Sequence, residues 1–139
     1  MATSVVKYTG ELRTVCTHLR SEKEIITDAP TDNRGKGAAF SPTDLAATSL
    51  ATCMLTVMGI AAEERRLKFE GASAEVTKFM YSNPRRIGKI QIAMEIPDFG
   101  YGEKEKAVLR RTAERCPVAE SLHPDIEVVL DISYTSHHH

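Results

Sequence analysis

The longest hydrophobic pattern in the chain predicts one helix over residues 42–65. Ser41 is a favourable N-cap, Pro42 suits the first helical position, and Asp44 completes an approximate capping box. Over residues 45–62 nearly every position is apolar or small, which is typical of a helix buried on all sides. A domain of this size has difficulty covering such a helix, so we expect a partner surface, most simply a second copy of the chain.

Shorter patterns on both sides of this helix predict strands and two further helices. Alternation of apolar and polar positions, and turn residues between the segments, predict strands over residues 5–8, 12–19, 24–27, 72–81, 90–96 and 126–132. The further helices are predicted over residues 103–115 and 117–122, with Pro117 interrupting the first of them. A turn-rich loop with two glycines fills residues 28–40. This order predicts an α+β fold in which a mostly antiparallel sheet packs on helices.

Composition and charge narrow the class of protein. The 139 residues are 42% hydrophobic and 27% charged, with a formal net charge of −1, and we expect one domain over residues 1–135, followed by a tag remnant at 136–139. Basic residues are scattered among acidic ones, so no nucleic-acid partner is expected. No run approaches the roughly 18 apolar residues of a membrane span, and no apolar leader opens the chain. We therefore expect a cytoplasmic protein without a membrane partner.

The cysteines are the first candidates for chemistry. Three of them are too few for a secreted disulfide framework, and a pair in a reducing cytosol is more often redox-active than structural. Cys53, in the apolar helix, fits an inert buried thiol better than a reactive one when it is considered alone. Cys116 precedes Pro117 and should be the N-cap of the next helix, where the helix dipole lowers a thiol pKa; plain capping is the alternative. Cys16, in a predicted strand, receives no role.

A reactive thiolate needs a positive neighbour, and two arginines are candidates. Arg13 lies within strand-like sequence, where an inward charge would be unusual, and Arg34 lies in the loop before the long helix. For both, the alternative is an ordinary solvated side chain. Outside the tag, His18 and His123 are far apart in sequence and lack the spacing of metal ligands, so no metal is expected.

The stretch GKGAAFSPTDLAATSLATCM, with CPVAESL beginning 63 residues after its cysteine, resembles the OsmC/Ohr family of thiol-dependent hydroperoxide reductases. The resemblance covers nearly the whole domain and is strongest at residues 27–60 and 115–122. Its specific feature is the combination of a Ser-Pro helix start, a helical cysteine twelve residues after that serine, and a distant Cys-Pro pair. The resemblance implies an α+β fold in an intertwined homodimer, whose wrapped sheets bury two long central helices.

The resemblance also implies a mechanism. Cys53 matches the peroxidatic cysteine, which attacks the distal oxygen of an organic hydroperoxide or of hydrogen peroxide. Cys116 matches the resolving cysteine, which condenses with the resulting sulfenic acid to form a disulfide. An external dithiol reductant, such as a dihydrolipoyl group, restores both thiols, and no metal or organic cofactor is needed. The implied role is defence against oxidative or osmotic stress.

One part of the family pattern is absent. The family uses an early arginine to stabilise the thiolate, for which Arg13 is the best match by region and Arg34 the second. A glutamate near the start of the long helix commonly holds that arginine, and its position is occupied here by Thr43. The nearest acid, Asp44, either substitutes for the glutamate or only caps the helix. The departure resembles the broader OsmC-like branches more than Ohr.

Two other functions stay open at this point. A non-catalytic dimer of the same fold would bind a small apolar molecule between its subunits. A redox sensor would pass its disulfide to a partner protein.

Overall fold

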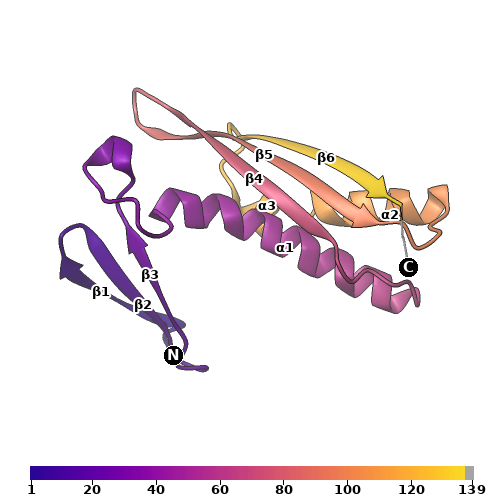
Figure 1. The fold of residues 1–139 in the computed structure, drawn as a ribbon, viewed down its shortest axis with the longest axis horizontal. Helices are drawn as coiled ribbons and strands as arrows, with labels where there is room; N and C mark the ends of the chain where they lie inside the picture. Colours follow the sequence, from indigo (N-terminus) through magenta and orange to yellow (C-terminus); the bar gives the residue numbers. More distant parts are fainter. Residues whose placement is uncertain (137–139) are drawn as a thin grey trace. The chain divides into compact units, whose positions relative to one another are not determined.

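The computed structural model describes residues 1–136, so residues 137–139 of the predicted tag remnant lie outside the described part. The predicted order of strands and helices is confirmed, with one short 3-10 helix added (Figure 1). The elements are β1 (Ser4–Gly10), β2 (Arg13–His18), β3 (Glu24–Asp28), η1 (Thr31–Asn33), α1 (Pro42–Glu64), β4 (Ser73–Tyr81), β5 (Arg86–Pro97), α2 (Glu103–Glu114), α3 (Pro117–Ser121) and β6 (Glu127–Thr135). The chain divides into two compact units, Met1–Ala46 and a second that begins at Ala47.

The first unit contains an antiparallel sheet in the order β1-β2-β3. Neighbouring residues of a strand point to opposite faces of its sheet, and both members of the pairs Val5–Val6 and Ile25–Ile26 are exposed. Among the described residues, every buried hydrophobic side chain lies at Ala47 or later in the chain. The first sheet therefore leaves apolar side chains uncovered on both of its faces.

The second unit contains a mixed sheet in the order β4-β5-β6 (Figure 1). β4 is antiparallel to β5, whereas β6 is parallel to β5. The sequence led us to expect one mostly antiparallel sheet. Three of the four strand pairings are antiparallel, but the described chain forms two three-stranded sheets in place of one, and the second contains a parallel pairing. The parallel pairing follows from the connection, because α2 and α3 return the chain to the starting end of β5 before β6 begins.

The hydrophobic core lies between the helices and one face of this second sheet. Ile90, Ile92, Met94 and Ile96 alternate along β5 and are buried, as the period of two predicted. They belong to one cluster with the buried residues of α1 and α2. Burying each of these large side chains contributes about 1.5–3 kcal/mol relative to leaving it exposed. This core includes Cys116, and Cys53 of α1 packs against it.

In the single chain α1 is buried on one face and open on another, so burial on all sides would need the partner surface expected from the sequence and stays a prediction. Seven of its residues are buried, whereas Thr52, Thr56 and Ile60, at helical spacing, are exposed, Ile60 by 54%. The hydroxyls of Thr52 and Thr56 donate to the carbonyls of Ser49 and Thr52 at 2.9 and 2.7 Å. These hydroxyls are satisfied within the helix, which leaves the open face only weakly polar.

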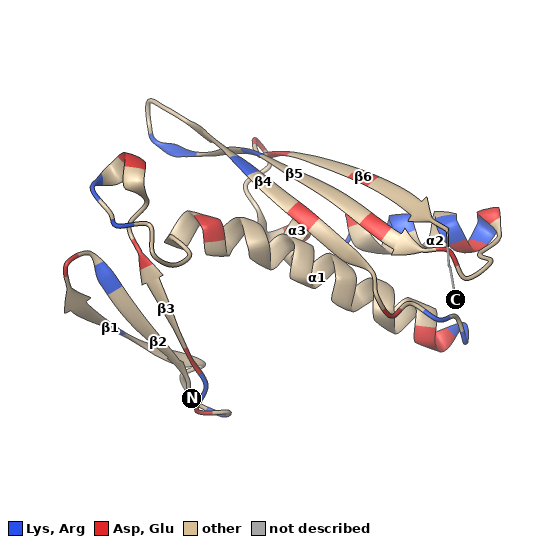
Figure 2. Ribbon diagram, viewed as in Figure 1, with Lys and Arg blue, Asp and Glu red and all other residues tan. Residues whose placement is uncertain are grey.

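By length and composition alone, α1 could also cross a membrane, with a mean hydropathy of 1.8 over its most apolar window. The expectation that no segment approaches a membrane span is wrong by these two measures. Figure 2 shows almost no charge along the middle of the helix. A helix of a protein core passes the same test, and α1 contributes its buried residues to the core described above. The composition of α1 is therefore accounted for by its place in the fold.

Candidate active site

Cys53 lies in the middle of α1 at the border between its buried and open faces. Its neighbours Leu50, Ala51 and Met54 are buried, whereas Cys53 itself is half-buried. It is a free cysteine. Cys53 is therefore not fully buried in the single chain.

Cys116 is the N-cap of α3, as the sequence predicted. Its Sγ accepts a hydrogen bond from the backbone N–H of Ala119 at 3.4 Å, and Pro117 occupies the first helical position. Its carbonyl accepts from the N–H of Glu120 at 3.0 Å. The residue is only 1% exposed and belongs to the hydrophobic core. The cap fixes the direction of the sulfur, and the core closes the sulfur off from solvent.

The fold brings the two cysteines together although 63 residues separate them in sequence. Cys53 packs against the core cluster that contains Cys116, close enough for its side chain to raise the pKa of Cys116, and neither cysteine is in a disulfide. α1 supplies one sulfur, and the junction between α2 and α3 supplies the other. Two neighbouring thiols, one partly open and the other covered, are a suitable arrangement for reversible disulfide chemistry.

The predicted low pKa of Cys116 is wrong. Burial, which disfavours the thiolate, is the main cause that raises the pKa of Cys116, and the neighbouring Cys53 raises it further. The backbone N–H groups of Ala119 and Val118 act in the opposite direction, as expected for a helix cap, but they do not prevail. Cys116 is therefore a protonated thiol at neutral pH.

Arg13, at the start of β2, makes a two-point ion pair with Asp28 at the end of β3. Its Nε and Nη2 donate to the two carboxylate oxygens at 2.7 and 2.9 Å. Asp28 is only 3% exposed, and Arg13 is the main cause that lowers the pKa of its carboxyl group. The backbone of Ala38 lowers the pKa of this carboxyl group as well. Such a fork holds the guanidinium in one orientation.

Sequence reasoning did not single out Asp28. The two residues are direct partners across the β2–β3 ladder, where opposite charges stabilise a pair. The predicted strands, 12–19 and 24–27, ended one residue before Asp28, so it was assigned to the following loop. A register that pairs the two hydroxyls of Thr14 and Thr27, which are hydrogen-bonded, places Arg13 opposite Asp28. This alignment was the available signal.

The other three candidates lie in the first unit near the start of α1. Asp44 accepts from the Ser41 N–H and donates its own N–H to Ser41 Oγ, both at 3.0 Å, which confirms the predicted capping box. The hydroxyls of Thr43 and Ser41 are hydrogen-bonded at 3.2 Å. Arg34 follows η1 in a left-handed conformation and is exposed. Among the candidate arginines, Arg13 is thus the one with an ordered carboxylate fork.

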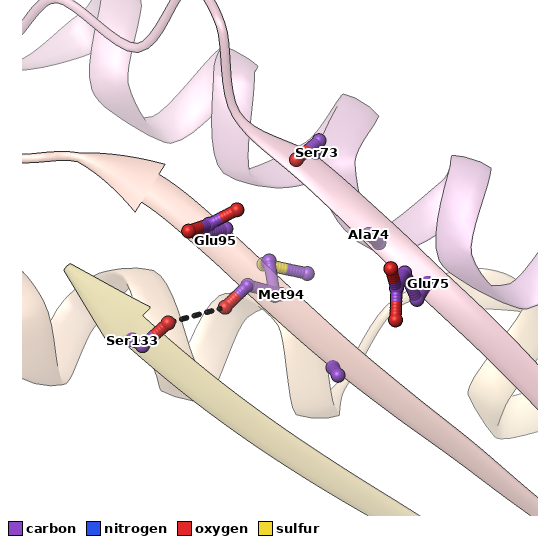
Figure 3. A pocket seen from close by; sticks show the side chains of 7 residues that line it. Ser73, Ala74, Glu75, Met94, Glu95 and Ser133 are labelled. Carbon is purple, nitrogen blue, oxygen red and sulfur yellow. Dashed lines mark hydrogen bonds between the residues drawn. The ribbon is translucent and has the colours of Figure 1, made fainter. Parts of the chain in front are cut away.

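A shallow hollow of about 330 Å³ lies elsewhere, on the second sheet (Figure 3). Its lining includes Ser73, Glu75, Glu95 and Ser133, and neither cysteine belongs to it. Within residues 1–136, no group of three or more histidine, cysteine or acidic side chains is arranged to hold a metal ion. The cysteine pair and the Arg13–Asp28 pair are therefore the arrangements that carry candidate chemistry.

The combination of a helical cysteine with a distant Cys-Pro cap, now seen as neighbours, can be compared with known proteins. A sequence profile of the family described as OsmC-like protein matches residues 35–131. The chain belongs to the OsmC-like family. The matched range includes both Cys53 and Cys116. A comparison with curated protein sequences finds no match.

Solved structures of OsmC-like proteins share this fold. A protein of Psychrobacter arcticus 273-4, named for osmotic stress induction and a detoxification response, is 51% identical, with 96% of each chain covered and a TM-score of 0.92. An organic hydroperoxide resistance protein, OsmC, of Legionella pneumophila is 22% identical over 96% of this chain and 98% of that one, with a TM-score of 0.70. One from Elizabethkingia anophelis is 19% identical over 97% and 98%, with a TM-score of 0.72. The last two show likeness of fold alone.

Proposed function

We propose that this OsmC-like protein is a cysteine-based hydroperoxide reductase that acts on organic hydroperoxides or hydrogen peroxide. The observation that carries the proposal is that Cys53 packs against the core cluster containing Cys116 and raises its pKa, while Cys53 is half-buried and Cys116 is covered. The thiol that a peroxide can reach is then the attacking one. The covered thiol is in place to resolve the product.

In the proposed cycle, the Cys53 thiolate forms a bond to the distal oxygen of the hydroperoxide, and the O–O bond breaks. The leaving alkoxide takes up a proton and departs as an alcohol, or as water when the substrate is hydrogen peroxide. Cys53 is now a sulfenic acid. Cys116 attacks its sulfur, the S–O bond breaks, water leaves, and a disulfide remains. An external dithiol, such as a dihydrolipoyl group, reduces the disulfide by exchange and becomes a disulfide itself.

Arg13 is our candidate for the positive charge that stabilises the Cys53 thiolate. The resemblance to the family suggests this role, and the two-point ion pair with Asp28 supports it. A guanidinium that is already held in one orientation loses less conformational entropy when it interacts with a thiolate. We infer that Asp28 takes the place of the family glutamate, whose position is Thr43 here. Asp44 is engaged in capping α1.

We also propose that the protein works as a homodimer. The first sheet exposes apolar residues on both faces, and α1 has an open, weakly polar face. Monomeric proteins rarely leave contiguous apolar surface of this kind uncovered. A second copy would cover both surfaces.

Hydroperoxide consumption tests the proposal. Wild type, Cys53→Ser and Cys116→Ser are each given tert-butyl hydroperoxide, cumene hydroperoxide or hydrogen peroxide with a dithiol reductant. We expect turnover that Cys53→Ser abolishes and that Cys116→Ser impairs. Turnover no higher than that of Cys53→Ser with any substrate and dithiol would overturn the enzyme assignment and favour a non-catalytic binding protein.

A further inference from the structure

α3 is a single short turn whose N-terminus depends on the Cys116 sulfur. The helix has five residues, and its first, Pro117, has no N–H. The next two N–H groups, of Val118 and Ala119, both interact with Cys116 Sγ. A helix this short is marginal without its cap, because nucleation is costly and few bonds follow it. The reduced sulfur is therefore the principal N-terminal support of α3.

The same sulfur is the one that would form a disulfide with Cys53. A disulfide requires an S–S distance of about 2.05 Å and a torsion near 90°, which fix the direction of both sulfurs. In the reduced protein, Cys116 Sγ accepts the N–H of Ala119 at 3.4 Å, and Cys53 and Cys116 are free cysteines. It cannot keep the cap geometry unchanged while it moves to bonding distance.

We propose that formation of the Cys53–Cys116 disulfide uncaps α3 and loosens it, so that this helix responds to the redox state of the cysteine pair. The proposal rests on the proposed function in that it takes this disulfide as part of the cycle. In the covalent step the Cys116 sulfur bonds to the sulfur of the Cys53 sulfenic acid, the S–O bond breaks, and the hydroxyl leaves as water with the thiol proton; the sulfenic sulfur is reduced and the Cys116 sulfur is oxidised. With an azodicarboxamide oxidant such as diamide, the same bond forms while the N=N group takes up the two hydrogens.

Loosening of α3 would help the external dithiol to reduce the disulfide. Cys116 is 1% exposed, and the half-buried Val118, Ala119 and Leu122 of the α3 segment pack against the core beside it. A dithiol cannot reach a sulfur that is covered in this way. An uncapped α3 would open this cover only in the oxidised protein, which is the state that needs the reductant.

Hydrogen–deuterium exchange measured by mass spectrometry on the full chain tests this switch. The Cys16→Ser variant, which lacks the third thiol, is compared in its reduced form and after oxidation with diamide. Because an N-cap is lost, we expect exchange at Val118 and Ala119 to become about five- to tenfold faster on oxidation. A peptide from α2 should keep its rate. The matched control is Cys16→Ser/Cys116→Ser, whose serine caps the helix but forms no disulfide, so its α3 should exchange slowly with or without diamide.

The mass of the intact chain distinguishes a failure of the proposed redox response of α3 from a failure of the proposed peroxidase function. A loss of two hydrogens on diamide treatment with unchanged α3 exchange would overturn the switch and leave the peroxidase proposal standing. No such loss would overturn both, because the sulfurs could then not form the bond. Faster exchange in the control with serine at position 116 would also overturn the switch, since the effect would not come from the disulfide.

Discussion

Cys53 and Cys116 illustrate how surroundings decide the role of a residue. Both are cysteines on or beside helices, and sequence alone favoured a lowered thiol pKa for Cys116 because of its cap position. Burial raises the pKa of Cys116 more than the cap lowers it. A thiolate loses more hydration free energy on burial than its interactions with two N–H groups supply. The local cap could be predicted from Pro117, but the burial of its sulfur depends on core residues distant in sequence.

A first prediction concerns Asp28. In Asp28→Asn the fork to Arg13 loses its charge, and hydroperoxide turnover should fall by on the order of tenfold to a hundredfold, as when a catalytic group is misplaced. Adding Thr43→Glu, which restores a carboxylate at the family's position, should recover part of the rate. Circular dichroism and thermal unfolding would check that each variant is folded. Full activity in Asp28→Asn would contradict the role given to this carboxylate.

A second prediction concerns pH. Arg13 lowers the pKa of Asp28 below its ordinary value of 3.8. The unfolded chain therefore binds this proton at a higher pH than the folded chain does. The ion pair should contribute its full stability above pH 3.8 and lose that contribution as pH falls through the lowered pKa. Unfolding curves between pH 6 and pH 2, compared for wild type and Asp28→Asn, should diverge at the upper end and converge at the lower. Parallel curves would contradict the assignment.

At the scale of elements, local signals were reliable and long-range ones were not. The caps at Ser41 and Cys116 and the alternation along β5 depend on neighbouring residues, and each was predicted correctly. The parallel pairing of β6 with β5 depends on the path of α2 and α3, which return the chain to the starting end of β5. The open face of α1 could not be predicted either, because a uniformly apolar sequence does not say which side meets the sheet.

The buried face of α1 gives a third prediction. Met58 is fully buried in the core, so Met58→Ala should lower the free energy of unfolding by about 2–5 kcal/mol. The control Glu64→Ala, at the exposed end of the same helix, should change it by about 0.5 kcal/mol or less. Chemical denaturation followed by circular dichroism would measure both. Equal effects would show that the core does not hold α1 as described.

At the scale of the whole molecule, buried and exposed apolar residues are unevenly distributed along the chain. All buried hydrophobic residues among residues 1–136 come from Ala47 onward, while the first sheet keeps apolar side chains exposed. The sequence pattern of a strand could not reveal this uneven distribution. Alternation predicts the two faces of a sheet, but it does not predict what covers each face. The family resemblance supplied the expectation of an intertwined dimer.

The dimer is the fourth prediction. Sedimentation at micromolar concentration should give twice the chain mass of 15.4 kDa. Thr56→Arg, which places a charge on the open face of α1, should shift the protein towards the monomer. The matched control Thr77→Arg, on the exposed side of β4, should leave the dimer intact. A clean wild-type monomer would contradict the account of the uncovered apolar surfaces.

The most direct test of the account is a single-turnover titration of the reduced protein with cumene hydroperoxide. Free thiols are counted, and the peptides are mapped by mass spectrometry. The account predicts that each equivalent of hydroperoxide consumes two thiols and links the peptides of Cys53 and Cys116, leaving Cys16 free. Both thiols unmodified in excess hydroperoxide would contradict the proposal that this cysteine pair reduces hydroperoxides.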